Sequence, residues 1–211
     1  NGGLGGHGGQ GPAAPGEVAQ TYGDLRDPGE PGGGGCSAAD GGAAGGNGGG
    51  LCRIGAQALV LEGLIDADGI GADRPDLFST DGAGAGAGGT VRISAEAVRG
   101  GGEIRANGGA ALRAAATPGG GGGGRIALST LDLSGFTGSI QARGGGLLPA
   151  LDRPESQGGA GTVHILRLPG ALALLRIDNG GRNSAAGPSP LDLPLAELHL
   201  ERLEVRGAAR A

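Results

Sequence analysis

Short segments of alternating side chains, recurring every 35–39 residues, constrain this chain more than any other feature. In each segment apolar residues occupy every second position, which is the pattern of a β-strand with one buried face. Such a period predicts one structural unit that is repeated and stacked along the chain. The second apolar residue of each segment marks the period: Ile54, Ile93, Leu128, Ile165 and Leu200.

A second short strand follows each of these segments and leads into a turn. Most of the turns contain Asn-Gly or Asp-Gly, which tolerate the positive φ that a sharp corner needs. Two strands cannot bury an apolar face alone, so neighbouring units must stack and pair in parallel. We therefore expect an all-β fold, a parallel β-helix or related β-solenoid of about five coils, forming one continuous domain over residues 51–211. The second strands are LIDADG (64–69), EIRANG (103–108), SIQARG (139–144), LRIDNG (175–180) and EVRGAARA (204–211).

The alternation also predicts which side chains face the core. The residues that mark the period should form one buried ladder: Ile54, Ile93, Leu128, Ile165 and Leu200. The residue before each of them should point outward, which gives a second column: Arg53, Arg92, Ala127, His164 and His199.

Glycine dominates the remaining sequence. The chain has 54 Gly and 12 Pro among 211 residues, a share typical of disordered sequence, but the regular strands argue for order. GGLGGHGGQG (2–11) repeats every three residues, which is the period of a polyproline-II helix. We expect glycine-lined extended segments of this kind, including 41–50 and 119–124, to stack beside the strands. Residues 1–50 would be a glycine-rich entry segment packed on the coils; mobile surface loops are the alternative.

The combination of GGGGGGRIAL, GGAGTVHI and GEIRANGG resembles the glycine-rich repeats of large bacterial surface and secreted proteins. The resemblance extends over about residues 51–211 and is one of repeat style. It implies an extracellular solenoid and identifies no functional residue. The opening GGX repeat is also similar to that of glycine-rich antifreeze proteins, although those lack aliphatic strands like the ones here.

Two cysteines, Cys36 and Cys52, flank a glycine-rich stretch. A disulfide between them would reduce the entropy of the unfolded loop and so stabilise the folded chain by roughly 3 kcal/mol. It would also indicate an extracellular or cell-surface location. We expect this bond; two unpaired thiols are the alternative.

Candidate sites for chemistry are weak. Asp66, Asp68 and Asp73 form an oxygen-rich sequence that could bind calcium, but no bidentate Glu follows at EF-hand spacing, and a turn explains Asp68 equally well. His164 and His199 share a column but lack an evident third metal ligand. GAGAGG (84–89) precedes a strand, which is the wrong context for dinucleotide binding. We therefore expect no enzymatic activity and no cofactor, with calcium as the one candidate.

Charge and composition narrow the partners. The net charge is −5, which gives no electrostatic reason to expect nucleic acid, and no apolar run is long enough for membrane insertion. With only Tyr22, Phe78 and Phe136 as aromatic residues, the platforms that sugar-binding grooves use are scarce. A carbohydrate-binding β-helix module, with an extracellular polysaccharide as its partner, remains an alternative.

The two termini of the sequence suggest self-assembly. GAARA (207–211) followed by NGG (1–3) repeats the internal motif GEIRANGG (102–109) with two substitutions. We expect a homopolymer in which the last coil of one molecule is completed by the first residues of the next, giving an extracellular structural filament. A passive segment of a large adhesin is the alternative. The predicted interface residues are Asn1, Gly2, Gly3, Val205, Gly207, Ala209 and Ala211.

Overall fold

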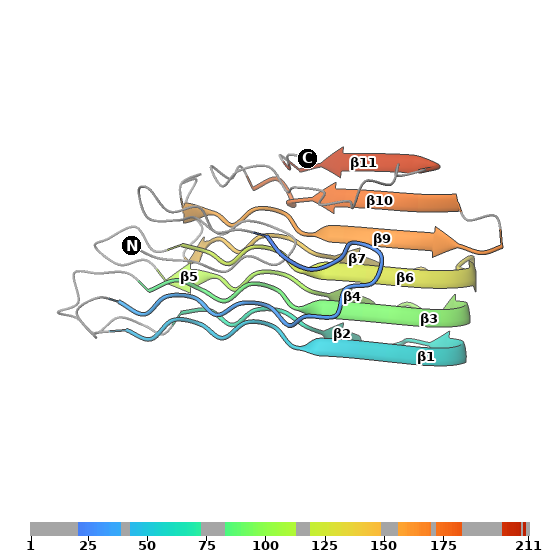
Figure 1. Cartoon of the computed structure of the whole chain (residues 1–211), viewed down its shortest axis with the longest axis horizontal. Helices are drawn as coiled ribbons and strands as arrows, with labels where there is room; N and C mark the ends of the chain where they lie inside the picture. The colour runs from blue at the N-terminus through green and yellow to red at the C-terminus, as the bar shows by residue number, and fades with distance from the viewer. Residues whose placement is uncertain are drawn as a thin grey trace.

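The computed structural model describes the chain as strands and extended segments, with no α-helix in the part described (Figure 1). The described residues are 21–38, 43–72, 83–112, 119–148, 156–169, 172–182, 200–207 and 209.

A six-stranded mixed sheet is the largest element, and its strands follow the order β1-β3-β6-β9-β10-β11. The first four pair in parallel, β10 is antiparallel to β9, and β11 is parallel to β10. The all-β prediction is therefore correct, with a reversal of direction in the upper part of this sheet. The strands are β1 (Leu51–Val60), β3 (Thr90–Arg99), β6 (Arg125–Asp132), β9 (Thr162–Arg167), β10 (Leu172–Asp178) and β11 (Arg202–Arg206).

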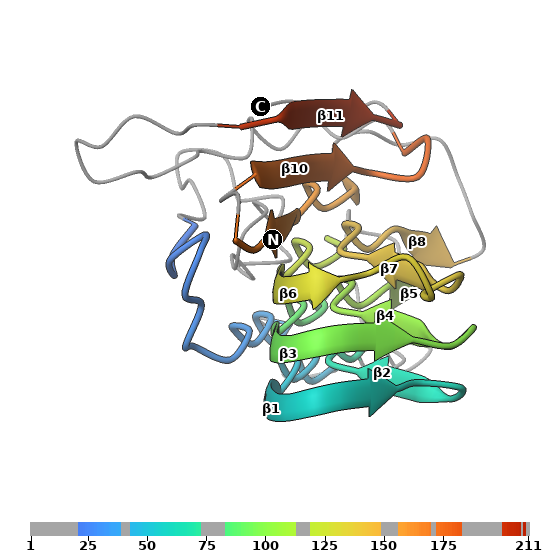
Figure 2. The same ribbon diagram turned by 90° about the vertical axis from the view of Figure 1, so that its right-hand side faces the viewer.

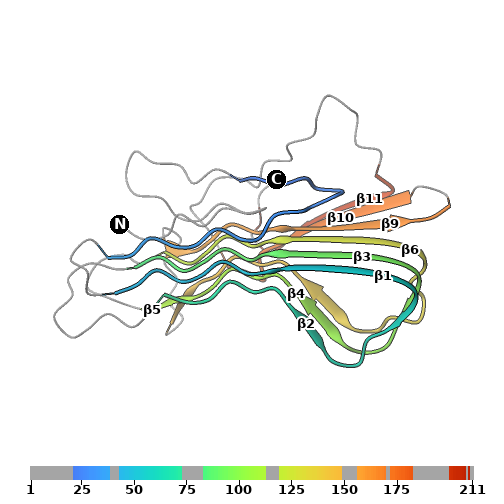
Figure 3. The ribbon, with the colours of Figure 1, turned by 60° about the horizontal axis from the view of Figure 1, so that its bottom comes forward.

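A smaller sheet lies opposite the main sheet (Figure 2). Its three parallel strands follow the order β2-β4-β7. A turn joins each of the first three long strands to the short strand that follows it (Figure 3), so β1 with β2, β3 with β4, and β6 with β7 form three successive units. A third, two-stranded sheet lies among the extended segments. The remaining strands are β2 (Leu64–Asp66), β4 (Glu103–Arg105), β7 (Ser139–Gln141), β5 (Ala111–Leu112) and β8 (Leu147–Leu148).

The predicted core ladder is correct for the first four long strands. The register pairs Ile54 with Ile93, Ile93 with Leu128, and Leu128 with Ile165. Ile93 and Leu128 are each only 1% exposed, whereas Ile54 on the end strand is partly buried. Ile104 of the second sheet joins the same apolar cluster, so the space between the two sheets is filled by aliphatic side chains.

The fourth and fifth units depart from the prediction. LRIDNG (175–180) does not form a strand of the second sheet; its first four residues belong to β10, where Leu175 pairs with His164 of β9. Leu200, expected as the next member of the ladder, precedes β11 and packs on a separate cluster with Leu25 and Leu175. The reversal between β9 and β10 places β10, and not a fifth coil, against the last parallel strand.

The predicted outward column is also partly wrong. Ala127 and His164 are buried, each 4% exposed, while Arg53 is exposed and Arg92 is partly exposed. His199 lies outside the described residues.

The cause is the segment 21–31, which lies on the outer face of the main sheet. Glu30 accepts a hydrogen bond at its carbonyl oxygen from the Thr90 hydroxyl (2.7 Å), and Tyr22 accepts one from Arg125 Nε (3.0 Å). Leu25 is buried against Leu175 of β10 and its neighbours. The entry segment thus covers the side of the sheet that alternation alone assigns to solvent.

Extended glycine-rich segments run together on the side away from the turns (Figures 1 and 3). Successive amides of 84–89 donate in turn to three neighbouring segments, so every third amide bonds to the same segment. The three segments are 31–38, 119–124 and 67–72. Three residues is the repeat of a polyproline-II helix, whose own backbone groups are free to bond outward. We call these segments and their equivalents the glycine flank. The bonds from 83–89, donor first, are Gly84–Cys36, Ala87–Gly33, Ala85–Gly119, Gly88–Gly122, Gly86–Ile70 and Gly89–Ala67.

Glycine is required in the flank because backbones touch there. A Cβ on Gly86, Gly121 or Gly158 would lie within 3.0 Å of the carbonyl oxygen one unit earlier in the stack. No side chain fits such a gap. The prediction that glycine-lined extended segments pack side by side is therefore confirmed for these segments, whereas 2–11 lies outside the described residues.

Candidate assembly surfaces

The β1 end of the stack exposes the edge of a ten-residue strand. In the described part of the chain, β1 pairs only with β3. The Gly50 carbonyl oxygen accepts the Thr90 amide at 2.9 Å, and successive residues of a strand present their backbone groups to alternate edges. The amides and carbonyls of Leu51, Arg53 and Gly55 therefore face the open edge, where an added strand would find them.

Apolar side chains accompany this edge. Val60 is 66% exposed, and Ile70, Leu64 and Leu51 are also exposed. The inward-facing Ile54, which a unit on either side would bury completely, is covered from one side alone. The β1–β2 end thus presents a cut face of the apolar core together with unpaired backbone groups.

Two glycines at this end, Gly50 and Gly63, occupy positions that must be glycine in the units stacked on them. A Cβ on Gly50 or Gly63 would meet nothing within 4 Å. Their equivalents one unit later, Gly89 and Gly102, must be glycine because the carbonyl oxygens of Gly50 and Gly63 approach them too closely for a Cβ. Gly55 also faces open space, but its partner in the register is Ser94, so this position tolerates a Cβ.

The glycine flank behaves differently at the same end. Asn47 and Ile70 occupy the positions at which the next unit has Gly86 and Gly109, and those glycines lie against the carbonyl oxygens of Asn47 and Ile70. A further unit of the same shape would bring its own carbonyl oxygens onto the side chains of Asn47 and Ile70. The strands are open to continuation at this end, and the flank is closed.

The opposite end contains the part of the predicted interface that can be placed. Val205 on β11 is 44% exposed, Gly207 adopts a φ of 60°, and Ala209 packs on the Leu25 cluster. Because β10 reverses direction, β11 runs opposite to β1. A copy stacked in the same orientation would therefore meet β11 through an antiparallel pair, not the parallel pair expected from the repeat. Asn1, Gly2, Gly3 and Ala211 lie outside the described residues.

An ionic cluster on β11 was missed by the sequence analysis. The Glu204 carboxylate is bonded by Arg176 at 2.8 Å and by Arg202 and Arg206 at 2.9 Å each. The hydrogen bond from Arg176 is the main reason that the pKa of Glu204 lies below its usual value. The alternation in RLEVR places these charges on one face of the strand, which is the signal that could have identified them.

The candidate calcium ligands are engaged with the neighbouring unit. Asp66 lies 2.9 Å and Asp68 3.4 Å from Arg105, and the Asn107 amide donates to Asp68 at 2.6 Å. Burial raises the pKa of Asp68; for Asp66 burial acts in the same direction but is outweighed by hydrogen bonds from the Asp68 amide and Arg105, so its pKa is lowered. These carboxylates join one unit to the next. Within the described ranges no group of three potential metal ligands occurs, and Asp73 lies outside them.

Cys36 and Cys52, the pair expected to form a disulfide, are both free thiols in the structure. The amides of Gly32 and Gly35 donate to Gly49 and Gly46, so the two extended segments run antiparallel and Cys36 lies at the far end from the strand. Cys36 therefore lies beside the residues near Gly46, six residues before Cys52. At about 3.1 Å per residue of extended chain, Cys36 and Cys52 are about 20 Å apart. A disulfide needs Cα atoms within about 7 Å.

His164, one of the two histidines with a possible role as a metal ligand, is buried. Burial lowers the pKa of His164, and the charge of Arg26 lowers it further, while Asp24 acts in the opposite direction. The histidine therefore belongs to the contact between the main sheet and the segment above it, and not to a surface column.

No family model, curated protein or solved structure matches this chain. In the described ranges, no helix has the length and apolar character needed to cross a bilayer.

Proposed function

We propose that this chain is an extracellular structural protein, a β-solenoid that associates with copies of itself at the β1–β2 end by strand addition. The observation that carries the proposal is the pair Gly50 and Gly63. In the single chain a Cβ at either position would contact nothing, so glycine is not needed there. The equivalent positions of the stacked units, Gly89 and Gly102, must be glycine. A neighbour at this end explains that choice.

The physical chemistry of the edge supports the same proposal. Proteins normally protect exposed edge strands with proline, lysine, bulges or a covering segment. β1 has ten residues, LCRIGAQALV, without proline and with Arg53 as its single charged residue, and its end exposes Leu51, Val60 and Leu64. Pairing this edge would give its backbone groups hydrogen-bond partners. It would also bury apolar surface, which stabilises an association by about 25 cal/mol for each Å² buried.

The closed flank limits what the neighbour contributes. Because Asn47 and Ile70 obstruct a further flank segment, the contact is made by strands alone. We propose that β11 of a second copy supplies the strand, antiparallel to β1. This contact joins two different surfaces, so it generates an open chain of molecules unless a rotation closes it.

The experiment uses three alanine variants measured by sedimentation velocity and electron microscopy. Gly50→Ala adds a Cβ to open space in the single chain but places it against an added strand, so filaments should be lost while the melting temperature of the subunit stays the same. Gly55→Ala is the matched control, since Ser94 occupies the equivalent stacked position, and it should assemble normally. Gly63→Ala reports whether the contact also extends to the second sheet.

The opposite result would refute the proposal. If Gly50→Ala assembles as the unaltered chain does, β1 is not the contact. Monodisperse single chains of the unaltered protein would favour the alternative of a passive segment in a large surface protein.

A further inference from the structure

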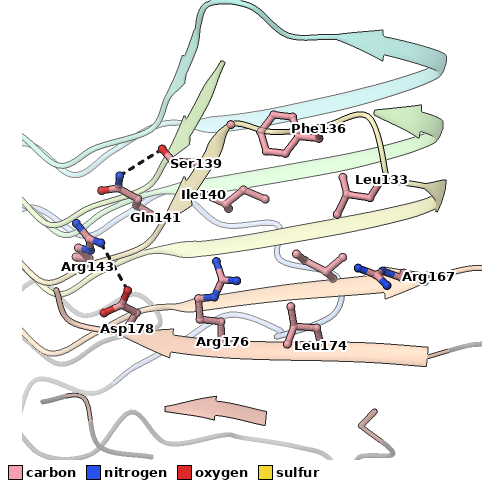
Figure 4. A pocket seen from close by; sticks show the side chains of 12 residues that line it. Leu133, Phe136, Ser139, Ile140, Gln141, Arg143, Arg167, Leu174, Arg176 and Asp178 are labelled. Atoms are coloured by element: carbon pink, nitrogen blue, oxygen red, sulfur yellow. Dashed lines mark hydrogen bonds and ion pairs between the residues drawn. The ribbon is translucent and has the colours of Figure 1, made fainter. Parts of the chain in front are cut away.

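The second sheet ends one strand earlier than the parallel part of the main sheet. β1, β3 and β6 each lie opposite a short strand, but β9 has no such partner among the described residues, because β10 joins the main sheet. A groove of about 370 Å³ lies between β7, β9 and β10 (Figure 4). Its place is that of a fourth strand in the second sheet.

Apolar side chains form one part of the lining of this groove. Phe136 and Ile140 lie on the β7 side and Leu174 on the main sheet (Figure 4). Ile165 of β9 also lines the groove. Ile140 is the third member of the column Ile65–Ile104–Ile140. An apolar side chain at the next position of this column would contact the apolar part of the lining.

The rim of the groove carries an excess of positive charge. Arg143 lies 3.6 Å from Asp178, and Arg176 bonds Glu204 at 2.8 Å. Arg167 is exposed and makes no ion pair with any other described residue. The lining therefore contains three guanidinium groups and a single carboxylate, that of Asp178.

The edge of β7 can accept a strand. The Ser139 amide donates to the Gly102 carbonyl at 3.2 Å, and the Gln141 carbonyl accepts the Ala106 amide at 2.9 Å. The backbone groups of Ser139 and Gln141 therefore point toward the β4 side. By alternation, the amide and carbonyl of Ile140 face the groove. An extended peptide that adds as a strand uses both of these groups together.

We propose that this groove binds an extended acidic segment of a partner protein, which adds to β7 as a further strand. One apolar side chain of the segment lies on Ile140 and Leu174. Its carboxylates bind Arg167 and Arg143, with the bidentate geometry that guanidinium groups favour. This site is separate from the β1 edge and is independent of self-assembly.

The probe is the peptide LEGLIDADG, residues 61–69 of this chain, which has three carboxylates and no basic residue. It contains the sequence of β2, the most acidic strand of the second sheet. Binding is measured by fluorescence anisotropy and by amide hydrogen exchange at Ile140. We expect the peptide to slow exchange at Ile140, and Arg167→Glu to weaken binding at least tenfold. Arg99→Glu, the same charge change at another exposed arginine, should leave the affinity unchanged, and a peptide with the three acids replaced by amides should bind weakly.

Three results would overturn the proposal. The first is equal binding by the Arg167→Glu variant and the unaltered chain. The second is an Ile140 amide that is already protected without peptide, which would mean that the chain fills its own groove. The third is binding of oligogalacturonate in place of the peptide, which would identify the groove as a site for acidic sugars.

Discussion

The strand half and the glycine flank belong to the same three units but are packed in different ways. In the strand half, aliphatic side chains such as Ile93 and Leu128 fill the space between two sheets. In the flank, backbone touches backbone, and positions such as Gly86 and Gly121 leave no room for a Cβ.

This difference decides what each half tolerates. The buried ladder accepts both isoleucine and leucine, since aliphatic residues of similar volume exchange at modest cost. The flank positions at which backbones touch, such as Gly86, Gly121 and Gly158, accept glycine alone. A repeat can therefore vary in its strands while these contact positions of the flank stay glycine, and three predictions test this contrast from the largest effect to the smallest.

The largest effect is expected in the flank. Gly121→Ala would place a Cβ against the carbonyl of Gly86, and neither backbone can move without breaking hydrogen bonds to its neighbours. We expect a loss of about 3 kcal/mol or more in the free energy of unfolding, at the upper end for overpacking, measured by urea denaturation. Gly34→Ala is the matched control, because its Cβ would lie 3.6 Å from its nearest neighbour, and it should change stability by less than about 1 kcal/mol. Equal effects would show that the flank is not tightly packed.

A smaller effect is expected in the strand half. Leu128→Ala leaves a cavity in the ladder and should cost about 2–4 kcal/mol in the same urea experiment. Arg92→Ala removes the ion pair with Asp27, both groups being substantially exposed, and should cost under about 1 kcal/mol. If the two losses are equal, the assignment of inner and outer faces is wrong.

The smallest effect concerns the outer face of the sheet. Burial and Arg26 lower the pKa of His164 in the folded chain, so the unfolded chain binds the proton more tightly. The stabilisation from the neutral histidine is present above pH 6.5 and is lost as the pH falls below that value. The melting temperature should therefore decrease from pH 7.5 to pH 5, and His164→Gln should reduce the decrease. An unchanged slope in that variant would place His164 outside a protected contact.

The regular part of the fold could be predicted because its signals are local. Alternation around Ile93 and Leu128 assigns a face, and the spacing assigns the register, so both follow from a few neighbouring residues. The three-residue glycine repeat likewise indicates extended segments that pack closely.

The reversal at β10 could not be predicted in this way. LRIDNG has the same alternation and turn residues as EIRANG, and only the tertiary structure places it in the main sheet. The covering segment 21–31 was missed because Leu25 is its single buried leucine and no period surrounds it. The spacing of the two cysteines is uninformative for a related reason: it does not reveal that 31–38 and 43–50 pair antiparallel, with Cys36 at the end of the pair away from Cys52.

The backbone-to-backbone packing of the flank has a calorimetric consequence. Unfolding it exposes mainly peptide groups, which lower the heat capacity, whereas unfolding a side-chain core exposes apolar surface, which raises it. The heat-capacity increment of this chain should therefore fall below the usual value of about 12–15 cal/mol/K per residue. A smaller increment flattens the curve of stability against temperature, so the folded state of this protein loses less of its stability on cooling than a protein of equal length with an aliphatic core throughout.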